Sequence, residues 1–143
     1  MKSLTDIETL VNKLYDYFGA KPIGSYILFL NDLISFDDIN DIDFIVSKNR
    51  SENLFKYLSD LGYTQSILKG SQIGYEKGSV IYERLPQGDF KKSDSLNIDI
   101  VIDDSMIIFK CPEIIKNKFE RGTKRDFETL QKIINKKLNN ING

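Results

Sequence analysis

The hydrophobic and polar positions alternate with two periods along the chain, and they predict a mixture of helices and strands. Apolar residues at spacings of three and four predict helices over residues 7–18, 25–35, 53–61, 112–121 and 127–138. Runs rich in β-branched and aromatic residues predict strands at 42–46, 63–68, 79–85 and 96–102, with a short one at 106–109. We expect one domain, residues 1–143, of the α/β (α+β) class, with a small mixed β-sheet flanked by helices.

Capping residues and turn residues set the predicted boundaries. Thr5 and Glu8 form a capping-box pattern at the first helix, and Thr123 with Asp126 forms another at the last. Glycines predicted to end helices or to mark turns are Gly19, Gly62, Gly70, Gly74, Gly78 and Gly122. Residues 86–95 are polar and rich in turn formers, and they predict an exposed loop.

Composition narrows the class of protein without naming a function. The net charge of −1 is too close to neutral to predict nonspecific nucleic-acid binding. No run approaches the roughly 20 apolar residues that cross a bilayer, and the first ten residues lack the apolar core of a signal peptide. We therefore expect no membrane association and a cytoplasmic location, which the single cysteine, Cys111, also suits.

Acidic residues stand inside two strand-like runs and are the main candidates for chemistry. Asp41 and Asp43 are two residues apart and so project from one sheet face, and Asp99 can share that face on the later strand. If the strands are neighbours, the three carboxylates can converge, and they would repel one another unless a cation joined them. The sequence has no histidine, so carboxylate oxygens are the plausible ligands and Mg²⁺ the expected ion. Asp41 and Asp43 alone would also suit an exposed strand edge.

Charge is distributed unevenly along the chain. Acidic residues outnumber basic ones between residues 31 and 60, and basic residues outnumber acidic ones between 110 and 137. Solvated helix faces are one explanation, and a metal-binding wall that faces a phosphate-binding wall is the other.

Several short motifs together resemble a known family. They are Gly24-Ser25 at a helix start, Asp41-Ile42-Asp43 in a strand, Asn97-Ile98-Asp99 in a later strand, and the basic run FERGTKRDFETL. In this order they resemble the nucleotidyltransferases of the DNA polymerase beta superfamily. The similarity is closest to the compact bacterial branch that includes abortive-infection-type toxins and antibiotic or tRNA nucleotidyltransferases, and it covers residues 18–134.

The resemblance implies a nucleotidyltransferase-like fold and a two-metal enzyme. The expected reaction moves a nucleoside monophosphate from a nucleoside triphosphate (NTP) to an acceptor hydroxyl and releases pyrophosphate. Asp41, Asp43 and Asp99 would hold two Mg²⁺ ions, and Asp99 would also act near the attacking hydroxyl. The triphosphate would contact Gly24 and Ser25, and the residues implied for the triphosphate or the acceptor are Lys118, Arg121, Lys124 and Arg125.

Other functions stay open at this point. Thr129 stands where the compact branch often carries an acid, which allows a catalytically inactive binding or regulatory module, as in a toxin–antitoxin-like pair. A further hypothesis is an enzyme that needs a partner protein. The acceptor could be tRNA, a protein side chain or a small molecule. Gly24 and Ser25 also suit simple helix capping, as Asp126 does, and Arg121 and Arg125 suit a solvated surface.

Overall fold

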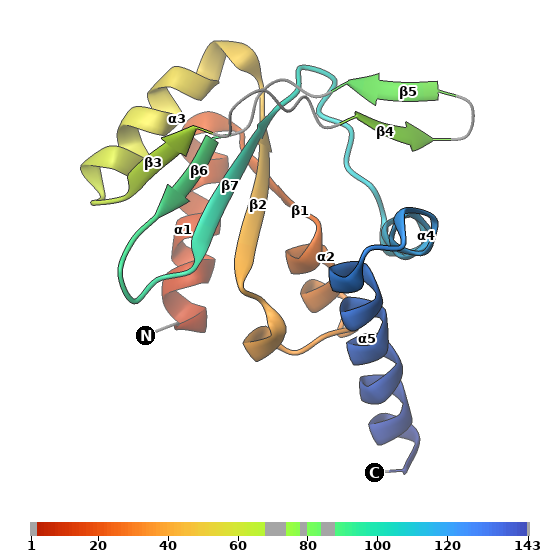
Figure 1. Cartoon of the computed structure of the whole chain (residues 1–143). Helices are drawn as coiled ribbons and strands as arrows, with labels where there is room; N and C mark the ends of the chain where they lie inside the picture. Colours follow the sequence, from red (N-terminus) through yellow and green to blue (C-terminus); the bar gives the residue numbers. More distant parts are fainter. Residues whose placement is uncertain (1–2, 68–73, 78–79, 84–87, 143) are drawn as a thin grey trace.

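The structure is a computed structural model that describes residues 3–67, 74–77, 80–83 and 88–142 (Figure 1). Its helices are α1 (Leu4–Phe18), α2 (Ser25–Leu30), α3 (Lys48–Asp60), α4 (Cys111–Arg121) and α5 (Lys124–Asn142), with a 3₁₀ helix η1 at Phe36–Asp38. Its strands are β1 (Lys21–Ile23), β2 (Asp41–Val46), β3 (Thr64–Ile67), β4 (Gly74–Lys77), β5 (Val80–Glu83), β6 (Gly88–Lys91) and β7 (Asn97–Ile102). The predicted turns at Gly70 and Gly78 lie outside the described residues, as do residues 68, 79 and 84–87 of the predicted strands and loop.

Five strands form one mixed sheet in the order β1-β2-β7-β6-β3. The central pair, β2 and β7, is parallel, and the other pairs are antiparallel. Strands β4 and β5 form a separate antiparallel pair. Helices flank the sheet, so the predicted α/β (α+β) class with a small mixed sheet is confirmed (Figure 1).

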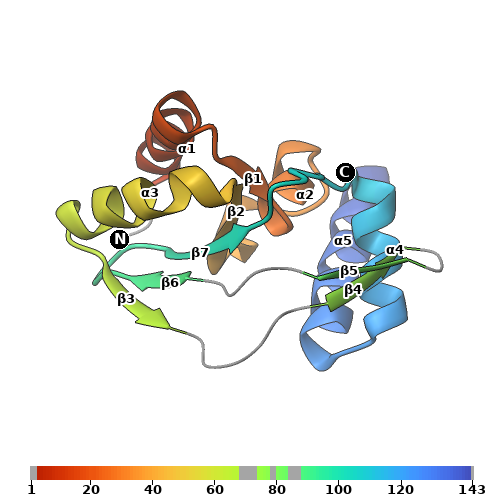
Figure 2. The ribbon, with the colours of Figure 1, turned by 90° about the horizontal axis from the view of Figure 1, so that it is seen from above.

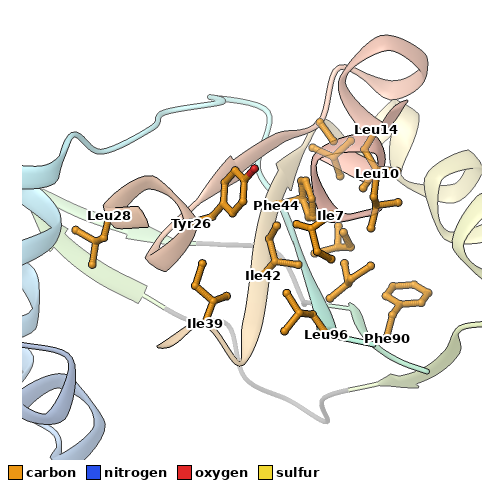
Figure 3. Packing of buried hydrophobic residues seen from close by; sticks show 14 of the residues in the cluster. Ile7, Leu10, Leu14, Tyr26, Leu28, Ile39, Ile42, Phe44, Phe90 and Leu96 are labelled. Atoms are coloured by element: carbon orange, nitrogen blue, oxygen red, sulfur yellow. The ribbon is translucent and has the colours of Figure 1, made fainter. Parts of the chain in front are cut away.

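One face of the sheet builds the main hydrophobic core. Helices α1 and α3 lie on this side of the sheet (Figure 2). The alternation of β2 buries Ile42, Phe44 and Val46 against α1, whose Ile7, Leu10 and Leu14 face the strand (Figure 3). Since adjacent residues of a strand point to opposite faces, this packing directs Asp41 and Asp43 to the other face.

Helices α4 and α5 pack against each other and join the same core through Ile114, Leu130 and Ile133. The outer half of α5 carries Ile134, Leu138 and Ile141 in exposed positions. Among the described residues, no helix combines the length and apolarity needed to cross a membrane.

The predicted boundaries of three helices are wrong. Helix α1 begins at Leu4, with Ser3 as its N-cap accepting a hydrogen bond from the Asp6 amide at 3.4 Å, so Thr5 and Glu8 lie inside the helix. Helix α3 begins at Lys48, five residues earlier than the apolar spacing predicts, because its first turn is polar and carries no periodic signal.

The helix predicted over residues 25–35 ends at Leu30. Asp32 takes a positive φ of 61°, a conformation that Asp and Asn adopt more readily than most residues. The Asn31 side-chain amide donates to the Ile27 carbonyl at 2.8 Å and so satisfies one of the last carbonyls of the helix.

The predicted exposed loop at residues 86–95 contains strand β6, so that prediction is wrong. Phe90 is fully buried and packs on Phe55 with ring centroids 5.1 Å apart. Gly88 leaves the room for this packing, because a Cβ there would lie 2.9 Å from the Phe90 ring. A four-residue strand with one large apolar residue gives almost no periodic signal, and pairing with β7 and β3 decides its structure.

The short strand predicted at residues 106–109 is also absent from the described structure. Met106 has a φ of 51°, which is incompatible with an extended strand. Met106 and Ile108 pack over Ile23, Ile45 and Val101 on the outer face of the sheet. The apolar run that resembles a strand is therefore an irregular segment that covers this face.

The junction of α4 and α5 follows the predicted cap closely. Gly122 takes a left-handed φ of 63° and ends α4. Asp126 and Thr123 cap α5 reciprocally: the Thr123 amide donates to the Asp126 carboxylate at 3.1 Å, and the Asp126 amide donates to the Thr123 hydroxyl at 3.1 Å. Arg121 adds two hydrogen bonds to the same carboxylate, from Nε at 2.8 Å and from Nη2 at 2.6 Å. These hydrogen bonds hold the pKa of Asp126 well below its usual range.

We expect Asp126→Asn to lower the free energy of unfolding by about 1.5–3 kcal/mol, because Asp126 is buried and its hydrogen bonds involve a charged group. Since the folded pKa lies below the unfolded value of about 3.9, this stabilisation is present above that pH and is lost as the pH falls below it. Urea unfolding at pH 7 and pH 3 measures both effects. Glu128→Gln, on an exposed position of α5, is the control, and equal stability of the two variants at pH 7 would contradict the capping role.

Candidate functional site

The acidic residues singled out in the sequence lie on the outer face of the sheet, at its central parallel pair. The register of β2 and β7 places Asp43 directly opposite Asp99. The side chains of these two residues lie within hydrogen-bonding reach of each other. The prediction that Asp43 and Asp99 meet on one face of neighbouring strands is confirmed.

A third carboxyl, Asp89 on β6, continues the row. Asp89 lies opposite Asp99 in the antiparallel β6–β7 register, and its side chain is also hydrogen-bonded to Asp99. We call Asp43, Asp99 and Asp89 the acid row. Burial is the main cause that raises the pKa of Asp99 to about 8, followed by the charge of Asp43 and the hydrogen bonds with Asp89 and Asp43.

Gly24 closes one end of the acid row. It follows Ile23, which is paired with Asp43 in the β1–β2 register, and it adopts φ 68° and ψ −134° at the start of α2. A Cβ at Gly24 would lie 2.9 Å from Asp43 Oδ2. Glycine is therefore required here both by the backbone conformation and by the close approach to the carboxylate. Ser25, the next residue, is half-buried as the first residue of α2.

Asp41 lies two residues before Asp43 on the same face, opposite Asn97. Its Oδ2 accepts a hydrogen bond from Arg125 Nη2 at 3.3 Å. The Arg125 side chain is 82% exposed, whereas that of Asp41 is 27% exposed, so the guanidinium reaches over the carboxylate from the solvent side. The register thus places Asp41 two residues away from Asp99, and the side chains within hydrogen-bonding reach of Asp99 are those of Asp43 and Asp89.

The basic residues predicted to bind phosphate lie on α4 and α5, near the acids. Lys118 is largely buried, with its Nζ 3.9 Å from Asp126 Oδ1. Burial is the main cause that lowers the pKa of Lys118, against the opposing charge of Asp126. The charge of Asp43 acts on both Lys118 and Arg121. These two residues therefore lie within electrostatic range of the acid row.

Arg121 and Lys124 differ from Lys118 in what they can offer a ligand. Both hydrogen-bonding arms of Arg121 are engaged by Asp126, and this pairing raises the pKa of Arg121. Lys124 is exposed at the first turn of α5. Of the predicted phosphate-binding residues, Arg125 thus contacts Asp41 and Lys118 lies within electrostatic range of Asp43, whereas Arg121 stabilises the junction of the two helices.

The donor set consists of carboxylate oxygens, which suit Mg²⁺ and disfavour softer ions. Asp43 and Asp89 stand on opposite sides of Asp99, so the acid row is linear. Within the described ranges, no three acidic or cysteine side chains surround a single point closely enough to hold a metal. The carboxylates of Asp43 and Asp99 fit a cation, with the Asp43 carboxylate packed closely against Gly24, and Asp41 could join only after Arg125 releases it.

Asp89 is the site residue that sequence reasoning missed. It lies in the segment predicted as an exposed loop. The one available signal is the alternation of buried Gly88 and Phe90 around it, and three residues are too few to show a period of two.

A scan against protein-family models gave no match to the chain. Searches of curated proteins and of solved structures gave no match either.

We expect the unfolding free energy of the metal-free protein to fall as the pH rises from about 3.8 to about 8, because the folded state raises the pKa of Asp99. The stabilisation from protonated Asp99 is complete below its unfolded pKa and is lost through its folded pKa. Asp99→Asn cannot ionise, so this decline should be smaller in the variant, which becomes the more stable protein at pH 9. Denaturant unfolding in EDTA across this pH range measures the difference.

Asp37→Asn, on an exposed position of the 3₁₀ helix, should reproduce the wild-type pH profile. If Asp99→Asn unfolds more readily than the wild type at pH 9, the carboxyl group stabilises the sheet, and the repulsion assigned to it is wrong.

Proposed function

We propose that this protein is a Mg²⁺-dependent nucleotidyltransferase, which moves a nucleoside monophosphate from an NTP to an acceptor hydroxyl with release of pyrophosphate. The observation that carries the proposal is the register of Asp43 with Asp99 on parallel neighbouring strands, with Gly24 packed against Asp43. The order of these motifs in the chain, which resembles the DNA polymerase beta superfamily, supports the same reaction.

The acid row supplies a reason to bind a divalent cation. Three neighbouring carboxyl groups repel when ionised, and the charges of Asp43 and Asp89 add to burial, the main cause, in raising the pKa of Asp99. In the proposed enzyme Asp43 and Asp99 hold the cation, and Asp41 joins them when Arg125 turns away. Bound Mg²⁺ would neutralise phosphate charge and orient the reacting oxygens. Cation binding also replaces the proton that Asp99 otherwise retains.

The basic residues have complementary tasks in this proposal. Arg125 is exposed, and in this proposal it exchanges its Asp41 partner for a phosphate oxygen, since a guanidinium binds either group through the same N–H donors. Lys118 is held near Asp126 and acts as a fixed positive charge close to the acids. Gly24 lets a phosphate approach the backbone at the start of α2 beside Asp43.

The second candidate is a binding or regulatory module that keeps this architecture without catalysis. The contact between Arg125 and Asp41 favours it, because an acid paired with arginine is less available to a cation. Thr129 also favours it, because this residue stands where the resembling family often carries an acid. Its hydroxyl donates a hydrogen bond to the Arg125 carbonyl at 3.1 Å and supplies no carboxylate for catalysis. Labelled-NTP transfer assays with tRNA, protein and small-molecule acceptors separate the two candidates, because only the enzyme labels an acceptor. Repeating the assays with a partner protein added separates an enzyme that depends on that partner from an inactive module.

We expect Mg²⁺ to raise the affinity for an NTP by at least about tenfold, because the cation removes the repulsion between the acid row and the phosphates. Calorimetry with each of the four ribonucleoside triphosphates, in MgCl₂ and in EDTA, measures this difference. Asp43→Asn should abolish the Mg²⁺-dependent gain, and Asp37→Asn should retain it. Equal affinities in the two buffers for all four nucleotides would refute the proposed function.

We expect Arg125→Ala to weaken Mg²⁺-dependent NTP binding about tenfold to a hundredfold, since one hydrogen bond to a charged group contributes about 1.5–3 kcal/mol. The exposure of the side chain predicts an unchanged unfolding temperature. Lys137→Ala, on an exposed position farther along α5, is the control. Tighter nucleotide binding by Arg125→Ala would instead identify the Arg125–Asp41 pair as inhibitory.

A further inference from the structure

A concave region lies at the carboxyl ends of β2 and β7, away from the acid row. It is a hollow of about 1450 Å³. We call it the basic hollow, after the three cationic residues in its lining, Lys21, Lys48 and Arg50. Its volume exceeds the roughly 300–1000 Å³ of most small-molecule sites, so space does not limit the ligand.

An apolar patch separates the basic hollow from the acid row. Two residues beyond Asp43 and Asp99 on their strands, Ile45 and Val101 lie under Met106. Met106 also forms part of the lining of the hollow. The segment that follows β7 therefore crosses the outer face between the two sites, and a ligand in the hollow would not touch the acid row.

The cations of the hollow have no acidic partners in the part of the chain that the structure describes. None of Lys21, Lys48 and Arg50 takes part in an ion pair there. Lys21 comes from β1, whereas Lys48 and Arg50 come from the first turn of α3. Three positive side chains brought to one concavity without carboxylate partners favour an anion.

The guanidinium of Arg50 lies against Gly19, in the connection between α1 and β1. Gly19 has a positive φ of 66°, and a Cβ built there would lie 3.0 Å from Arg50 Nη1. Gly19 itself lines the hollow. The missing side chain at this position leaves room for the guanidinium at the rim.

The anchoring groups are side chains, because the first turn of α3 is already engaged. The Lys48 amide donates to Asp104 Oδ1 at 2.8 Å, and the Arg50 amide donates to the Ser47 carbonyl at 3.2 Å. The Asp104 carboxylate therefore interacts with the first turn of α3 through this hydrogen bond. Glu52 is the other carboxylate of the lining, so the cations still predominate.

Aromatic and aliphatic side chains complete the lining. Phe18 and Phe55 are half-buried there, together with Ile102 and Met106. Apolar surface beside cations matches a ligand that combines a flat apolar body with a phosphate. A free inorganic ion would leave this apolar surface in water.

We propose that the basic hollow binds a small phosphate-bearing molecule with an aromatic part, with its phosphate held by Lys21, Lys48 and Arg50 and without a divalent cation. The site is independent of the acid row and of the proposed transferase reaction. The three cations outnumber the two carboxylates of the lining, Asp104 and Glu52, and form no ion pair with them, so the phosphate can be held without a metal.

The test uses adenosine monophosphate, inorganic phosphate and adenosine as separate probes in EDTA, with backbone amide shifts of the ¹⁵N-labelled full chain as the readout. Adenosine monophosphate should shift the amides of Gly19, Lys21 and residues 47–51 and bind more tightly than either other probe. Arg50→Gln and Lys48→Gln should each weaken it roughly tenfold, as one charged contact predicts. Lys56→Gln, on an exposed position of α3 outside the lining, should bind like the wild type.

Shifts confined to Gly24, Asp43 and Asp99 would overturn the proposal and assign the nucleotide to the acid row. Equal affinities for inorganic phosphate and adenosine monophosphate would contradict the proposal that the ligand has an aromatic part. Wild-type affinity in both Arg50→Gln and Lys48→Gln would contradict the proposed phosphate contacts. Asp43→Asn should leave this binding unchanged while removing the Mg²⁺-dependent gain in NTP affinity. Failure here is therefore distinguishable from failure of the proposed transferase.

Discussion

The pairing of β2 with β7 is the constraint on which the rest of the structure depends. The pair buries Phe44, Ile98 and Ile100 on one face and, by the alternation of a strand, sets Asp43 beside Asp99 on the other. Fully burying one large apolar side chain contributes about 1.5–3 kcal/mol, so the core can hold two repelling carboxyl groups together. The register that stabilises the core is thus the same register that builds the site.

The basic residues near the site have different partners and different roles. Arg121 neutralises the buried Asp126 and fixes the junction of α4 and α5. That junction in turn positions Lys118 near the acids and places Arg125 over Asp41. A helix junction stabilised by one carboxylate therefore determines which positive charges face the acid row. Its loss would disturb both stability and charge at the site.

Two regions of opposite character lie along the central pair of strands. The acid row occupies the amino-terminal half of β2 and β7, and the basic hollow occupies their carboxyl ends. Met106 and Ile108 cover the face between them. Because the covering segment excludes water from Ile45 and Val101, it separates a region suited to cations from one suited to anions.

The sequence by itself determined the class of fold, the strands that carry Asp43 and Asp99, and the cap formed by Thr123 and Asp126, since each rests on a local pattern. Only the tertiary structure decided that β6 is a strand, that Asp89 joins the acid row, and that Arg125 contacts Asp41. These features depend on contacts between distant segments, and a four-residue strand or an exposed arginine has no periodicity that could predict them. The partners of a charged side chain are set by packing, which brings Arg125 to Asp41 across 84 positions of the sequence and Lys136 to Asp32 across 104.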